Sequence, residues 1–84
     1  MRNHYVVYTS WNDGGDTPGT NIIAVTHTKE DAKIIFDQCV KDEKIRAEDL
    51  GYTIYTDSPT FFGAVDEEGS GYTCVYLDEV IEYA

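Results

Sequence analysis

One segment of this chain has helical periodicity, and it constrains the fold more than any other feature of the sequence. Residues 28–50 place apolar side chains along one face at 3.6-residue spacing, and Gly51 follows as a C-terminal stop. Thr28, with Glu30 and Asp31 close behind it, resembles a helix N-terminus, where acidic side chains suit the positive end of the helix dipole. A single helix can cover only one face of whatever the rest of the chain builds.

Short runs rich in β-branched and aromatic residues lie on both sides of the helix and predict strands. The predicted strands are residues 4–10, 21–26, 52–57, 61–66 and 72–77, and the alternating tail 78–84 extends the last one. The order β-β-α-β-β-β predicts an α+β fold, with an antiparallel or mixed sheet and one helix packed on one face. With 84 residues and no linker-like segment, we expect residues 1–84 to form a single domain.

Two local features shape this prediction further. Residues 22–25 are apolar in succession, so we expect the second strand to be central and covered on both faces. Glu43 projects near the middle of the apolar face of the helix. We therefore expect a helix break or a register change around residues 42–44. The alternative is a continuous helix in which a buried partner holds the Glu43 carboxylate.

The chemistry-bearing residues show no motif. Cys39 and Cys74 form no CxxC pair, and their positions in the helix and a strand predict buried free thiols in a reducing compartment. The alternative is a buried disulfide bridge between them. His4 and His27 lack metal-ligand spacing. Adjacent strand carboxylates point to opposite faces and make poor acid–base pairs. We therefore predict no metal, no cofactor and no enzymatic activity.

No apolar run reaches the roughly 18 residues of a membrane span, and the N-terminus leads directly into a strand. We expect a cytoplasmic protein with no membrane partner. If the chain is encoded by a phage, this would be the host cytoplasm.

Charge is the most unusual property of the chain. Sixteen acidic residues against six basic ones give a net charge of −10. Five of the bases lie in the helix, whereas the rest of the chain has one base, Arg2, and nine acids. Such a chain is repelled by nucleic acids and attracted to basic protein surfaces. The acids outside the helix are Asp13, Asp16, Asp57, Asp66, Glu67, Glu68, Asp78, Glu79 and Glu82.

These features predict an acidic protein–protein interaction module. Its expected role is that of an inhibitor that docks on the basic surface of a host nuclease or other nucleic-acid-binding protein, without binding nucleic acid itself. In a more specific form of this hypothesis, the carboxylates occupy the positions of phosphates, so that the protein mimics nucleic acid. Trp11 beside the glycine-rich loop would serve as an aromatic anchor. The expected contacts are Trp11, Asp13, Asp16, Asp66, Glu67, Glu68, Asp78, Glu79 and Glu82.

In size, acidity and compact α+β order, the chain resembles small phage or mobile-element proteins that block host defences, of the anti-CRISPR type. The resemblance covers the whole chain as composition and layout. It includes no motif, so no functional residue is carried over. It implies an inhibitor of a host defence protein.

Two alternatives have other requirements. One is a non-catalytic accessory or scaffold domain that self-associates, which an apolar sheet face left uncovered by the helix would favour. The other is a small-ligand-sequestering protein that uses Trp11 and the tyrosines. An anionic ligand would then require Arg2 and the helix lysines to line its pocket.

Overall fold

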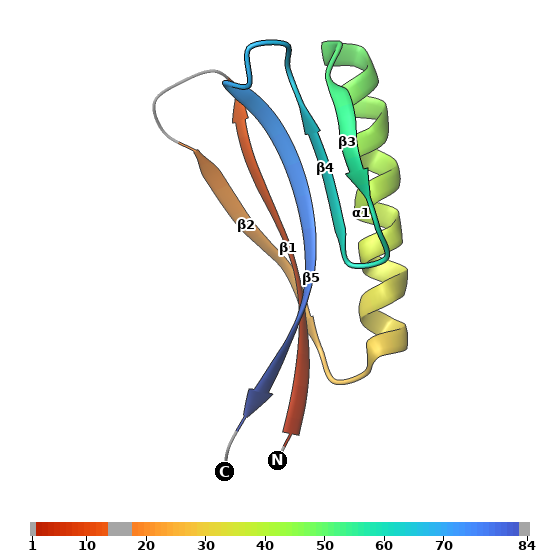
Figure 1. Cartoon of the computed structure of the whole chain (residues 1–84). Coiled ribbons are helices and arrows are strands. Elements are labelled where there is room, and N and C mark those ends of the chain that lie inside the picture. Colours follow the sequence, from red (N-terminus) through yellow and green to blue (C-terminus); the bar gives the residue numbers. More distant parts are fainter. Residues whose placement is uncertain (1, 14–17, 83–84) are drawn as a thin grey trace.

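The computed structural model describes residues 2–13 and 18–82, and within these residues one five-stranded sheet carries one helix. All neighbouring strands are antiparallel, in the order β2-β1-β5-β4-β3. The helix packs on one face of the sheet, so the predicted α+β fold is confirmed (Figure 1). The elements are β1 (Arg2–Asp13), β2 (Gly19–Thr26), α1 (Lys29–Leu50), β3 (Thr53–Asp57), β4 (Phe61–Val65) and β5 (Gly71–Glu82).

Helix α1 begins and ends where its sequence signals lie. The Thr28 hydroxyl accepts a hydrogen bond from the Asp31 N–H at 3.2 Å, which satisfies one of the first backbone donors. Gly51 has a φ of 74°, a left-handed conformation that favours glycine. Its N–H donates to the Glu48 carbonyl at 3.2 Å and so caps the last turn.

The helix runs without interruption through residues 42–44, so the expected break is wrong. Glu43 stays on the inner side of the helix because Thr73 of β5 donates a hydrogen bond to its carboxylate, with 2.7 Å between Thr73 Oγ1 and Glu43 Oε2. Thr73 is buried, at 2% exposure. The alternative, a buried partner for Glu43, is thus confirmed. A satisfied carboxylate removes the penalty that would otherwise favour a break.

The core lies between α1 and the sheet face that it covers, here called the helix face. Its largest fully buried side chains are Val7 of β1, Phe36 of α1, Phe62 of β4 and Val75 of β5. Full burial of such a side chain stabilises the fold by about 1.5–3 kcal/mol. The core therefore joins the helix to the three central strands.

Strand β2 is an edge strand, so the expectation that it is central is wrong. Its apolar run is not covered on both faces, because Ile22 is 65% exposed and Val25 is 59% exposed. A bulge explains the pattern. Val7 is opposite Ala24 while Tyr8 is opposite Ile22, which leaves Ile23 as the extra residue. Ile22 and Val25 consequently share the face away from the helix.

Two further expectations concern the strand ends and the thiols. The tail does extend β5, as far as Glu82. The two cysteines are free, as predicted, with Cys74 buried and Cys39 only half-buried. Burial first, and then the nearby Asp42 and Glu43, raise the pKa of the Cys39 thiol.

In the described part of the chain, no helix combines the length and apolar character that a membrane crossing requires.

Candidate functional site

The sheet face opposite α1, here called the open face, is the most distinctive surface of the molecule. The helix, the one found among residues 2–13 and 18–82, lies entirely on the other side of the sheet (Figure 1). Strand register determines which side chains point to the open face. Tyr8 is opposite Tyr76, and Tyr76 is also opposite Phe61, so these three rings lie side by side on neighbouring strands.

A continuous aromatic row crosses the open face. It consists of Tyr55 of β3, Phe61 of β4, Tyr76 of β5 and Tyr8 of β1. Ring centroids are 6.1 Å apart for Tyr55 and Phe61, 4.9 Å for Phe61 and Tyr76, and 4.6 Å for Tyr8 and Tyr76. The last pair is stacked at an interplanar angle of 12°. These spacings are those of favourable aromatic contacts, so the row is a rigid surface feature.

Hydrogen bonds fix both ends of the aromatic row. The Tyr8 hydroxyl donates to Asp78 Oδ2 at 2.7 Å, and this bond, followed by desolvation and the Asp78 charge, raises the pKa of Tyr8 to about 12. The Tyr55 hydroxyl lies 3.6 Å from Cys74 Sγ. Burial and then this contact raise the pKa of Tyr55 to about 12 as well. Both phenols therefore stay neutral around pH 7.

Gly63 allows the Tyr55 ring to lie directly over β4. A Cβ at position 63 would be 2.5 Å from Tyr55 Cζ, closer than such atoms approach. The absence of a side chain at Gly63 thus gives the ring its place on the open face.

Exposed aliphatic side chains continue this surface towards β2 and towards the outer part of β5. Ile22 and Val25 lie beside the row, on the β2 side of β1. Val80 is opposite His4 and is 49% exposed. The open face therefore combines stacked rings with exposed aliphatic groups, a combination typical of interaction surfaces.

Four of the predicted acidic contacts fall into two separate groups. Glu67 and Glu68 are exposed in the turn between β4 and β5, at one end of the sheet. Asp78 and Glu79 lie well along β5, where seven residues beyond Gly71 correspond to about 23 Å. Asp78 points to the open face, whereas Glu79 points to the opposite side and accepts a hydrogen bond from Asn3 Nδ2 at 2.7 Å.

Asp66 organises the β4–β5 turn. Its carboxylate accepts hydrogen bonds from the Ser70 N–H at 3.0 Å, the Ser70 hydroxyl at 3.2 Å and the Gly71 N–H at 2.9 Å. Desolvation acts to raise the pKa of Asp66, but the N–H groups of Gly71, Gly69 and Ser70 and the Ser70 hydroxyl outweigh it and lower the pKa. Asp66 thus remains negatively charged and holds Glu67 and Glu68 in place.

The other predicted contacts lie elsewhere. Asp13 and Glu82 end β1 and β5, and Asp16 lies outside the described residues. Trp11 belongs to β1 and not to the loop, because β1 pairs with β5 as far as Asp13. Its register places it on the helix face, where its ring lies against Gly19. Trp11 is therefore remote from the aromatic row.

All of the lysines and arginines except Arg2 lie in the helix. Sequence segments 3–28 and 51–84 contain no lysine or arginine, so Arg2 is the only cation in the five strands. Asp78 on the open face therefore has no lysine or arginine from the neighbouring strand segments beside it. The acidic character predicted from the sequence is thus a property of the sheet layer.

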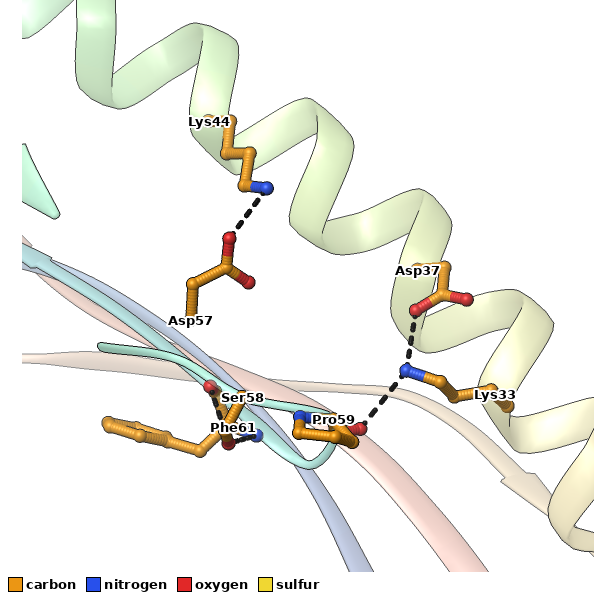
Figure 2. Close-up of polar contacts among 7 residues, drawn as sticks. All are labelled: Lys33, Asp37, Lys44, Asp57, Ser58, Pro59 and Phe61. Atoms are coloured by element: carbon orange, nitrogen blue, oxygen red, sulfur yellow. Dashed lines mark hydrogen bonds and ion pairs between the residues drawn. The ribbon is translucent and has the colours of Figure 1, made fainter.

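Lys33, Lys41 and Lys44 of the helix line a groove between α1 and the β3–β4 hairpin, and ion pairs engage Lys33 and Lys44 (Figure 2). Lys33 Nζ lies 2.8 Å from Asp37 Oδ1 and also donates to the Pro59 carbonyl at 3.2 Å. Lys44 Nζ lies 2.7 Å from Asp57 Oδ2. The contacts of Lys33 with Pro59 and of Lys44 with Asp57 fasten the hairpin to the helix. The two ion pairs also reduce the positive charge that the groove offers an anionic ligand.

The histidines are closer than the sequence indicated. The rings of His4 and His27 lie 5.1 Å apart at the end of the β1–β2 hairpin. Even so, no group of three or more His, Cys, Asp or Glu side chains suited to a metal ion occurs among the described residues.

Comparisons with models of protein families, with curated proteins and with solved structures found no match to this chain.

Proposed function

We propose that this chain is an acidic, non-catalytic protein–protein interaction module that docks on a basic surface through its open face. The observation that carries the proposal is the aromatic row, which has the Asp78 carboxylate at one end. Residues 3–28 and 51–84 contain no lysine or arginine, so Arg2 at the start of β1 is the one such residue in the strands. This combination suits a partner surface that is rich in arginine.

Each part of the open face has a distinct role in this docking. Arginine guanidinium groups stack on tyrosine faces and bind carboxylates through paired hydrogen bonds. The rings supply rigid apolar contact area at low entropic cost. Glu67, Glu68 and Asp78 attract the partner electrostatically and speed association. The partner's basic residues would thus meet both rings and carboxylates.

Basic surfaces of this kind occur on proteins that bind nucleic acids, so the proposed role is inhibition of a host nuclease or a related protein. Occupation of the basic surface would exclude DNA or RNA. The two acidic groups lie at different positions along β5, on either side of the aromatic row, and together could replace phosphates along a bound strand. The resemblance to anti-CRISPR proteins in size, acidity and layout fits this role.

The proposal is tested by capture on the immobilised chain from a bacterial lysate at low salt, followed by binding measurements with each purified basic protein. A true partner competes with DNA or RNA for the chain, and its affinity falls as salt rises. Asp78→Lys and the double variant Glu67→Lys/Glu68→Lys should each weaken binding at least tenfold.

The matched control for Asp78→Lys is Glu48→Lys, which makes the same charge change as Asp78→Lys at an exposed position of α1. It should bind nearly as tightly as the wild type. If the open-face variants and the control behave alike, docking through the open face is refuted, provided that circular dichroism shows all of them folded.

A second candidate function is that of an accessory domain that self-associates. It is favoured by the uncovered apolar character of the open face and of β2, where Ile22 and Val25 are exposed. The two candidates differ in the sign of their salt dependence. Attraction to a basic partner weakens with salt, whereas association of two acidic copies strengthens.

A further inference from the structure

Strand β2 forms an edge of the sheet that the protein leaves unprotected. Along one side it pairs with β1, and its other side carries backbone N–H and C=O groups that no strand of the described sheet pairs with. The strand has eight residues, Gly19–Thr26, and none of them is charged. Long, uncharged edges are templates for pairing with another strand.

The opposite edge of the same sheet is strand β3, which has features that discourage pairing with a strand of another chain. Strand β3 has only five residues, and its pairing with β4 is irregular between Ile54 and Thr56. It also ends in Asp57, whose carboxylate pairs with Lys44 of the helix. Short length, a bulge and a charge all discourage pairing at β3. Of these devices, β2 has only the bulge at Ile23.

We infer that β2 pairs antiparallel with β2 of a second copy of this chain, to give a two-fold symmetric dimer with one continuous sheet. An antiparallel pair of identical strands is self-complementary, as a two-fold interface requires. With the axis perpendicular to the sheet, the open faces of both copies lie on the same side. The exposed Ile22 and Val25 of the two copies then meet at the junction.

The absence of charge makes β2 the place where a second copy can approach most closely, and its self-complementary backbone edge suits an identical strand. Two chains of charge −10 repel each other over most of their surface. Residues 19–26 carry no charge, so contact there brings the fewest acids together. A basic partner would gain little from an uncharged strand, since its attraction is to the carboxylates of the turn and of β5.

The inference deepens the self-association candidate and does not depend on docking to a basic partner. It makes a distinctive prediction about salt. The Debye length falls from about 8 Å at 0.15 M to about 3 Å at 1 M ionic strength. Added salt therefore screens the repulsion between the copies, and dimerisation should strengthen.

The test is sedimentation velocity of the full chain from micromolar to millimolar concentration, in reductant, at 50 mM and 1 M NaCl. We expect reversible dimerisation with a dissociation constant at least threefold lower at 1 M NaCl. Val25→Lys places a charge on the exposed part of β2 and should raise the dissociation constant at least tenfold. It also lowers the net negative charge, so general repulsion cannot account for such a loss.

Two further variants separate the alternatives. Ile34→Lys makes the same chemical change on α1, where Ile34 is 70% exposed, and should leave dimerisation within twofold of the wild type. Tyr55→Ala removes an open-face ring remote from β2 and should also leave it unchanged. A wild-type chain that stays monomeric at 1 M NaCl, or a dimer that Tyr55→Ala abolishes and Val25→Lys does not, overturns the inference. Neither outcome affects binding to a basic partner, which is measured separately.

Discussion

The hydrogen bond between Thr73 and Glu43 should stabilise the fold through a measurable coupling. Thr73 is 2% exposed, Glu43 is half-buried, and 2.7 Å separates the hydroxyl from the carboxylate oxygen. Thr73→Val preserves the shape of the side chain and removes the donor. Glu43→Leu removes the acceptor and leaves a buried hydroxyl without this partner.

The magnitude follows from the charged acceptor. Hydrogen bonds to charged groups contribute about 1.5–3 kcal/mol, and an unsatisfied buried hydroxyl costs about 1–3 kcal/mol. We therefore expect each single variant to lower the free energy of unfolding by about 2 kcal/mol. Replacement of both partners by apolar groups is far less costly. The double variant should lose only about 1 kcal/mol, against about 4 kcal/mol for the sum of the two single effects, which gives a coupling energy of about 3 kcal/mol.

Urea unfolding followed by far-ultraviolet circular dichroism measures all of these free energies. Glu48→Leu, an exposed change in the same helix, is the control and should stay within about 0.5 kcal/mol of the wild type. If the two single effects add to within about 0.5 kcal/mol, then Thr73 does not hold Glu43. The hydrogen bond from Thr73 would then not be the reason why the helix continues through Glu43.

Three other changes test separate features. Gly51→Ala forces alanine into a φ of 74° and should destabilise the protein by about 1 kcal/mol in urea unfolding, without loss of the helix. Gly19→Ala would bring a Cβ within 2.3 Å of Trp11 Cζ2, so the indole must move, and the fluorescence maximum of the single tryptophan should shift; an unchanged spectrum would contradict this packing. The hydrogen bond to Asp78 raises the pKa of Tyr8 from 10.0 to about 12, so its contribution is complete below pH 10 and is lost as the pH rises through about 12. As the pH rises from 10 to 12, the melting temperature of Tyr8→Phe should therefore fall less than that of the wild type.

Most of the fold followed from local signals. Thr28 and Gly51 marked the helix ends because capping depends on one residue and its near neighbours. The strands followed from composition and turns, although β1 extends three residues beyond residue 10. The central position expected for β2 failed for a tertiary reason. A run of four apolar residues fits a central strand that is buried on both faces. In β2 the same run lies in an edge strand, where a bulge at Ile23 changes the alternation and several of the side chains stay exposed.

The candidate site was less accessible to sequence analysis. The excess of acids outside the helix was visible, but the aromatic row depends on register across four strands. Nothing local in Tyr8 or Phe61 indicates that both lie beside Tyr76. Alternation did predict that neighbouring acids such as Asp78 and Glu79 point to opposite faces, which the structure shows. The partner of Glu43 was also beyond local signals, since it comes from β5.

The pairing of β1 with β5 has a kinetic consequence. Their contacts include the hydrogen bond between Asn3 and Glu79, which are separated by 76 positions. Such high contact order slows folding, because the entropic cost of closing a long loop comes before the stabilising contacts between its ends can form. At about 5–20 residues per second on the ribosome, β1 waits several seconds for β5. Until then the β1–β2 hairpin and the β3–β4 hairpin have no strand between them, so a chain that stops before Gly71 cannot assemble this sheet.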